Sequence, residues 1–242
     1  MKIVSLVPSI TETLFDFGLT GNNVIGRTKF CIHPENSVKN VEIIGGTKNL
    51  NIEKIISLNP DLIIANKEEN EKLQVEELQK KYKVWVTDIQ NLEDNVKFIS
   101  EVGALLNKEK LANNFNDRIN AVFKAKEIFL SKKVAYVIWK NPYMTVGSDT
   151  FIHEILEKLG FDNIFKNKKR YPEISLDEMK SADYIFLSSE PFPFQQKHID
   201  ELQKELPDQK LILVDGEAFS WFGTHISRCA DYYKKLEEEI FA

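Results

Sequence analysis

The sequence predicts an α/β protein of two similar parallel-sheet lobes joined by one long bridging helix, with a ligand cleft between the lobes. Three observations lead to this prediction. Short continuous apolar runs alternate with amphipathic stretches, as in parallel strands covered by helices on both faces. The two halves of the chain repeat one order of elements. Between them lies a stretch of helical periodicity without glycine or proline.

Seven short apolar runs are the predicted strands. Each has the length of a buried strand and is bounded by turn-forming or polar residues. The runs are Ile3–Val7, Val24–Gly26, Leu62–Ala65, Val84–Thr87, Val134–Trp139, Tyr184–Ser188 and Leu211–Val214.

The two halves of the chain share a repeated pattern. Residues Ile55–Asp61 precede a strand in the first half, and residues Glu178–Asp183 precede a strand in the second. Each strand is followed by an acidic loop, a helix and a further strand that leads into an acid, Asp88 or Asp215. The alternative is the general similarity of any two α/β units, but the matched order favours two similar lobes.

The stretch from Glu109 to Leu130 is predicted as a bridging helix. Its apolar residues recur at spacings of three, four and seven, which places them on one helical face. A helix of about 22 residues spans about 33 Å. We therefore predict an N-terminal lobe over residues 1–107, a bridging helix over 108–131 and a C-terminal lobe over 132–242. A long surface helix is the alternative.

Composition narrows the class of protein. The chain has 242 residues, of which 43% are apolar and 29% charged, and a formal net charge of −5. These values are typical of a globular protein and argue against nucleic-acid binding. No apolar run approaches the length of about 20 residues that a membrane span needs. The apolar run after Met1 is too short for a secretory signal. We therefore expect a cytoplasmic chain as written, or a periplasmic or cell-surface protein whose leader was removed.

Ligands of open parallel sheets bind at the carboxyl ends of the strands, and in the first half these ends carry several candidate residues. Cys31 and His33 are two residues apart, and a thiolate and an imidazole both suit a transition metal. Two ligands do not close a metal site, so we expect one of them to be an axial ligand of a chelated metal; a small buried hydrophobe is the alternative for Cys31. Ser9 and Glu12 fit a helix capping box. The other candidates here are Phe30, Thr47, Lys48, Asn66 and Glu68.

The strand ends of the second half are rich in aromatic residues. Rings gathered on loops favour a flat binding surface, which suits a large planar ligand. The ligand-binding candidates of this half are Trp139, Tyr143, Glu190, Phe192, Glu217, Trp221 and Phe222, with Phe194 displayed beside Phe192.

Several motifs resemble one known family. The segments Ile3–Ser9 with Thr11-Glu12, and Leu58-Asn59-Pro60-Asp61-Leu62-Ile63, resemble the helical-backbone substrate-binding proteins of ABC importers, the family of cobalamin, haem and siderophore receptors. The closest branch is the cobalamin-receptor-like one, on the segments Gly46–Asn49, Ala65–Asn70, Ser188–Pro191 and Asp215–Glu217.

The resemblance implies two α/β lobes joined by one long helix, and it places Phe30, Trp221 and Phe222 on the wall of the ligand cleft. Two departures stand out. Asn66 occupies a position where cobalamin receptors can carry a tryptophan. Lys72 and Gly223 occupy the positions where the family places acids that dock on a permease.

The predicted function is reversible binding of a corrinoid or another metal chelate, with possible delivery to an ABC permease. We expect no catalytic residue and no catalytic cofactor, a cobalamin-like chelate as ligand, a monomer, and neither nucleic-acid binding nor membrane insertion. One alternative is a cytoplasmic corrinoid- or metal-handling enzyme such as a chelatase. Another is a protein that binds a bare transition metal through Cys31, His33, Glu217 and His225.

Overall fold

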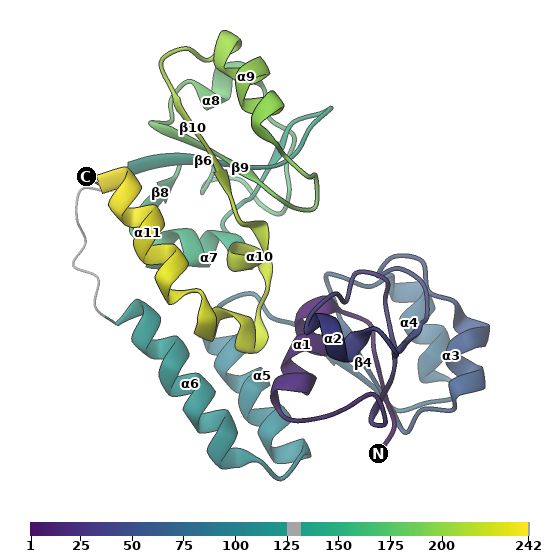
Figure 1. Ribbon diagram of the computed structural model, residues 1–242. Helices are drawn as coiled ribbons and strands as arrows, with labels where there is room; N and C mark the ends of the chain where they lie inside the picture. Colours follow the sequence, from purple (N-terminus) through teal and green to yellow (C-terminus); the bar gives the residue numbers. More distant parts are fainter. Residues whose placement is uncertain (125–131, 242) are drawn as a thin grey trace. The chain divides into compact units, whose positions relative to one another are not determined.

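The computed structural model describes residues 1–124 and 132–241, which divide into two compact units (Figure 1). Unit 1 comprises Met1–Ile89, Glu93–Ile119 and Phe222–Arg228. Unit 2 comprises the described residues of Gln90–Leu92, Asn120–Trp221 and Cys229–Ala242. The predicted lobes are continuous in sequence, whereas the structure assigns Phe222–Arg228, from the last part of the chain, to unit 1.

Unit 1 contains a parallel sheet in the order β3-β2-β1-β4-β5. Its strands are β1 (Ile3–Ser5), β2 (Val24–Arg27), β3 (Glu42–Ile43), β4 (Leu62–Asn66) and β5 (Val84–Thr87). Its first helices are α1 (Pro8–Asp16), α2 (Glu35–Val38), α3 (Ile52–Leu58) and α4 (Lys72–Gln79). The four strands predicted in this half are confirmed. The short strand β3 was not predicted, because its two residues are both exposed and give no apolar run.

Unit 2 contains a second sheet in the order β10-β9-β6-β7, with β8 paired to β6. Its strands are β6 (Lys132–Trp139), β7 (Met144–Thr145), β8 (Phe161–Asn163), β9 (Tyr184–Ser188) and β10 (Lys210–Val214). Its helices are α7 (Phe151–Lys158), α8 (Leu176–Met179), α9 (Gln196–Glu205), α10 (Gly216–Ser220) and α11 (Ala230–Phe241). The three predicted strands are confirmed, and all pairings are parallel except that of β7 with β6.

The repeated pattern corresponds to one hydrogen-bond arrangement in both units. The carboxylate of Asp61 accepts a hydrogen bond from the backbone N–H of Lys2 at 2.6 Å. In unit 2 the carboxylate of Asp183 accepts one from the backbone N–H of Lys133 at 2.9 Å. Each aspartate also donates its own N–H to the carbonyl of the same lysine, both at 2.8 Å. The aspartate therefore aligns the start of one strand with its neighbour in each unit.

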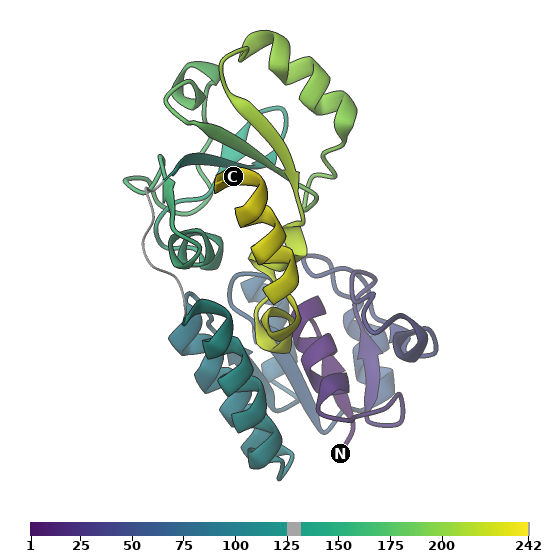
Figure 2. The same ribbon diagram turned by 60° about the vertical axis from the view of Figure 1, so that its left-hand side comes forward.

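The helices α5 (Leu92–Leu105) and α6 (Glu109–Phe123) lie side by side in Figures 1 and 2. Gly103 permits their close approach, because an added Cβ would lie 2.5 Å from the Cβ of Ala112. Helix α6 begins where the bridging helix was predicted to begin, and it contributes residues to unit 1 up to Ile119 and to unit 2 from Asn120. The remainder of the predicted helix, residues 125–131, lies outside the described residues.

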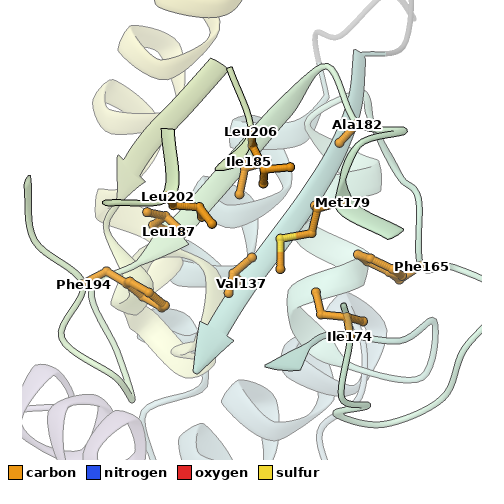
Figure 3. Packing of buried hydrophobic residues seen from close by; sticks show 11 residues of the cluster. Val137, Phe165, Ile174, Met179, Ala182, Ile185, Leu187, Phe194, Leu202 and Leu206 are labelled. Carbon is orange, nitrogen blue, oxygen red and sulfur yellow. The ribbon is translucent and has the colours of Figure 1, made fainter. Parts of the chain in front are cut away.

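The two central strands of unit 2 are buried on both faces, which explains their continuous apolar runs. Successive side chains of a strand point to opposite faces. Val137 and Leu187 join the cluster of Figure 3, which includes Met179. Phe186 lies on the other face, where its ring centroid is 5.2 Å from that of Phe161. This core holds the strand ends that carry the candidate residues.

Candidate functional site

The loop after β2 presents Phe30 and encloses Cys31. Phe30 is 49% exposed, and its ring lies over Gly46, where an added Cβ would be 3.3 Å from the ring. The ammonium group of Lys29 lies 5.0 Å from the ring centroid of Phe30. Gly46 therefore allows an exposed aromatic ring to rest against the backbone.

Cys31 has no exposed surface. The hydroxyl oxygens of Thr11 and Thr28 lie 3.0 and 3.2 Å from its sulfur. Burial raises the pKa of the thiol, despite these hydrogen bonds. The approach of Cys31 to a metal stays a prediction, which the enclosed thiol does not favour, because a metal ligand is a thiolate. Its alternative, a small buried hydrophobe, agrees with the structure.

The thiol of Cys31 is expected to resist alkylation. In the folded protein, iodoacetamide at pH 7.5 should modify it on the order of 100-fold more slowly than in urea, because the reactive thiolate is disfavoured and enclosed. Peptide mass spectrometry after timed quenching measures both rates. Rapid stoichiometric labelling of Cys31 in the folded protein would contradict this assignment.

His33 is half-buried. An electrostatic interaction with His33 is the smallest of the influences that lower the pKa of Glu12. Among the residues that the structure describes, no group of three or more histidine, cysteine, aspartate or glutamate side chains is placed to hold a metal ion. The set of Cys31, His33, Glu217 and His225 does not form such a group, and this argues against a bare-metal site.

The polar loop after β4 is organised by two buried asparagines. The side-chain oxygen of Asn66 accepts hydrogen bonds from the backbone N–H groups of Glu68 and Glu69 at 2.9 and 3.2 Å. The side-chain nitrogen of Asn70 donates to the carbonyls of Leu6 and Thr47 at 3.2 and 3.1 Å. Asn66 is only 3% exposed and shapes the loop. Its contact with ligand stays a prediction.

The other polar candidates of unit 1 are accessible. Lys48 is exposed, and its ammonium group donates to the carbonyl of Glu68 at 2.6 Å. Thr47 and Glu68 are half-buried. Burial raises the pKa of the neighbouring Glu69, against the nearby charge of Lys48. The segment after β3 therefore offers an ammonium group, and the loop after β4 offers carboxylates on a backbone that Asn66 and Asn70 hold in place.

The strongest aromatic feature of unit 2 is the pair formed by Trp139 and Phe192, which we call the aromatic shelf. Trp139, the last residue of β6, is 39% exposed. Its ring meets that of half-buried Phe192 edge-on at a centroid distance of 5.7 Å. Tyr143 is half-buried and packs against the core cluster. Phe194 was expected to be displayed, but it is buried in that cluster.

Trp221 and Phe222 are buried, contrary to the exposed wall that was expected of them. Trp221 is 6% exposed, and its indole N–H donates to Glu190 Oε1 at 3.0 Å. Phe222 is 5% exposed and lies edge-on to Phe98 in unit 1 at 5.7 Å. A buried indole needs an acceptor, and Glu190 supplies it. Glu190 also accepts from the hydroxyl of Ser220 at 2.5 Å.

Glu217 is half-buried at the start of α10, where its backbone N–H donates to the carboxylate of Asp215 at 3.0 Å. The short helix α10 therefore positions both glutamates: Glu217 lies within it, and Glu190 accepts hydrogen bonds from residues at its end. The exposed or half-exposed candidates that remain are Phe30, His33, Thr47, Lys48 and Glu68 in unit 1, and Trp139, Tyr143, Phe192, Glu190 and Glu217 in unit 2.

The model of the periplasmic binding protein family matches residues 3–209. The chain belongs to the periplasmic binding protein family. It is 25% identical over 195 residues to the vitamin B12-binding protein of Vibrio vulnificus, covering 77% of this chain and 71% of that protein. It is 33% identical over 175 residues to the ABC transporter substrate-binding lipoprotein YvrC of Bacillus subtilis, covering 67% of this chain and 54% of that protein.

Solved structures show the same fold. The haem-binding protein RhuT of Roseiflexus sp. RS-1 superposes with a TM-score of 0.82 at 18% identity, and the vitamin B12-binding protein BtuF of Vibrio cholerae with 0.79 at 19%. Each superposition covers 98% of both chains. These structures confirm the predicted two-lobed fold. The family match confirms the predicted family and makes the chain a solute-binding protein rather than an enzyme. Among its described helices, none is both long and apolar enough to cross a bilayer.

The sequence did not reveal an ion cluster in unit 1 of this binding protein, in which a buried Glu12 meets partly exposed partners. The carboxylate of Glu12 accepts hydrogen bonds from His225 Nδ1 at 2.8 Å and from Arg228 at 2.5 Å. The guanidinium of Arg228 also donates to both oxygens of Asp16 at 2.7 and 2.8 Å. The pairs are more than 200 residues apart in sequence, so no local pattern reveals them.

The capping box predicted from Ser9 and Glu12 is therefore wrong. Helix α1 begins at Pro8 with Val7 as its N-cap, and no side chain caps it. A proline is favoured in the first turn because its missing N–H has no helical partner there. Ser9 thus lies within the helix, and Glu12 is free to turn toward the segment 223–228.

Proposed function

We propose that this binding protein reversibly binds a flat metal chelate, a corrinoid in first place, and delivers it to a membrane importer. The observation that carries the proposal is the aromatic shelf. A tryptophan that exposes 39% of its surface at a strand end, edge-on to Phe192, offers an accessible apolar ring to a ligand. Large aromatic rings of this kind are the usual anchors of binding surfaces.

Further support comes from unit 1. Phe30 offers a second exposed ring, and Lys48 and Glu68 offer polar groups on other strand-end loops of the same unit. Ligand pockets combine apolar walls with a few polar groups that orient the ligand. Relatives named as vitamin B12-binding proteins agree with a corrinoid, and neighbours of the same fold are named as haem-binding.

The burial of Cys31 favours a corrinoid over haem. Haem iron is commonly held by an axial side chain such as histidine or a cysteine thiolate. Cys31 is enclosed, so among the two predicted axial ligands only His33 remains. A ligand that brings its own donors to the metal depends less on such a side chain. We therefore propose His33 as the axial ligand of the metal. We expect contacts with the aromatic rings to contribute most of the binding free energy of the chelate.

The proposal extends to location and partner. The relative from Bacillus subtilis is named as a substrate-binding lipoprotein of an ABC transporter. We infer that this chain is exported and acts as a monomer with a permease. The docking acids differ from those of the family, because Lys72 is basic and Gly223 is buried. Exposed Glu71, next to Lys72, is our candidate for the acid on unit 1.

The proposal predicts a specific effect of Trp139→Ala. Cyanocobalamin, haemin and Co²⁺ are each titrated into the protein and followed by absorption and thermal unfolding. A ligand at 100 times its Kd stabilises the folded state by about 2.7 kcal/mol, which is about 5 to 10 °C in Tm for a chain of this size. Trp139→Ala should weaken chelate binding by roughly 10-fold or more.

Leu213→Ala is the matched control, because Leu213 in unit 2 is 40% exposed, like Trp139. The affinity of the Leu213→Ala variant for the chelate should stay within about twofold of that of the unchanged protein. Binding of Co²⁺ alone, or equal affinities of the two variants for the chelate, would overturn the proposal.

A further inference from the structure

His198 supports the aromatic shelf from within unit 2. Its imidazole centroid lies 5.3 Å from that of Phe192 and 5.6 Å from that of Phe194, edge-on to both. His198 is only 9% exposed. The imidazole therefore packs against both Phe192 and Phe194, whose own ring centroids lie 4.7 Å apart.

The position of this imidazole is set by one hydrogen bond. His198 is the third residue of α9, and its Nδ1 accepts the backbone N–H of Gln195, the N-cap residue, at 2.9 Å. A glutamate or glutamine usually fills this role in a capping box. Because Nδ1 accepts, the neutral imidazole carries its proton on Nε2. A protonated imidazole carries a hydrogen on both nitrogens and cannot accept the Gln195 N–H.

The surroundings disfavour a charged imidazole. The pKa of His198 is lowered from 6.5, first by burial and then by the charges of Lys140 and Lys197, with Glu201 acting in the opposite direction. Lys140 forms an ion pair with Glu201. The positive charge of Lys140 therefore offsets part of the influence of Glu201 on the pKa of His198. The helix start also carries the positive end of the α9 dipole. At pH 7 the hydrogen bond is therefore intact.

We propose that His198 is a pH-responsive positioning residue, whose neutral imidazole holds Phe192 against Trp139 and whose protonation releases the shelf. The effect of His198 protonation on ligand binding rests on the proposed function, whereas its effect on the order of the aromatic shelf does not. A group with a lowered pKa in the folded state contributes stability above its ordinary value, 6.5, and loses it as the pH falls through the lowered pKa. The shelf is therefore ordered at neutral pH and loosened in mildly acidic solution.

The first test follows the shelf without ligand. The chain has three tryptophans, so 5-fluorotryptophan labelling gives three ¹⁹F signals, and the Trp139 signal is assigned by its loss in Trp139→Phe. Between pH 7.5 and 5 this signal should shift in the unchanged protein. It should stay constant in His198→Gln, whose amide oxygen accepts the Gln195 N–H at both pH values.

The second test measures affinity for cyanocobalamin at the same two pH values. The unchanged protein should bind roughly fivefold more weakly at pH 5, as expected for the loss of one buried hydrogen bond, and His198→Gln should change by less than twofold. His198→Phe keeps an aromatic ring but has no acceptor for the Gln195 N–H, so this variant should bind cyanocobalamin weakly at both pH values. His153→Gln is the control, because His153 is also buried in unit 2, and it should respond to pH like the unchanged protein.

The outcomes separate the two proposals. If cyanocobalamin fails to bind but the Trp139 signal shifts only where His198 is present, the proposed ligand is wrong and the role of His198 stands. If the Trp139 signal shifts equally in His198→Gln, or does not shift in the unchanged protein, the role of His198 is overturned. A ¹⁵N spectrum of His198 at pH 7.5 with the proton on Nδ1 would overturn it as well.

Discussion

Replacing Gly223 with alanine is expected to lower the free energy of unfolding by about 3 kcal/mol, as the sum of two costs of backbone strain and overpacking. Gly223 has φ +81°, a left-handed conformation that costs a residue with a Cβ about 1 to 2 kcal/mol. An added Cβ would also lie 2.1 Å from the hydroxyl oxygen of Thr13, which accepts the N–H of Thr224 at 3.2 Å. The substitution therefore strains the backbone and separates the segment 222–228 from α1.

Gly160→Ala is the matched control for this prediction. Gly160 has φ +82°, but an added Cβ would meet nothing within 4 Å. Its cost should be limited to the backbone strain, about 1 to 2 kcal/mol. Urea unfolding followed by far-ultraviolet circular dichroism gives both values. Equal losses for the two variants would show that the contact with Thr13 carries no energy.

Glu12→Ala is expected to lower the free energy of unfolding by about 2 to 3 kcal/mol at pH 7, less than the full cost of breaking a buried ion pair because one partner is partly solvated. The Glu12 side chain is 7% exposed and that of its partner Arg228 is 42% exposed. Removal of the carboxylate leaves His225 and Arg228 without this acceptor. The exposed pair of Glu35 and Lys39 is the control, and Glu35→Ala should cost less than about 0.5 kcal/mol.

The loss caused by Glu12→Ala should depend on pH in a defined direction. Burial alone would raise the pKa of Glu12, but the hydrogen bond and charge of His225 and the charge of Arg228 outweigh it, and the pKa lies below 4.5. The folded state therefore binds fewer protons than the unfolded state, and the carboxylate stabilises fully above pH 4.5. The difference between the two proteins should shrink as the pH falls through this lowered pKa. A constant difference from pH 7 to pH 3 would exclude Glu12 as its source.

Much of the fold was predictable because strands buried on both faces leave continuous apolar runs. All seven predicted strands exist, and Val84–Thr87 and Tyr184–Ser188 have the predicted bounds. The repeated aspartates Asp61 and Asp183 have the same role in the two units. The strands that escaped prediction, β3, β7 and β8, have at most three residues each, which is too short for a periodic signal.

The candidate site was predictable in its location but not in the direction of each side chain. Phe30 and Phe192 lie on strand-end loops, Trp139 is the last residue of its strand, and all three are at least partly exposed. Trp221 follows a strand end in the same way but turns onto Glu190. Both tryptophans look alike in sequence, because the acceptor that draws one indole inward lies 31 residues away.

The sequence by itself determined the family, the parallel strands and the loops that carry the exposed rings, because these depend on local periodicity and on motifs of adjacent residues. Only the tertiary structure decided which side chains those loops bury. Cys31, Asn66, Trp221 and Glu12 each find partners or packing that local sequence does not reveal. A buried polar group must be paired, and the identity of its partner is a property of the folded chain.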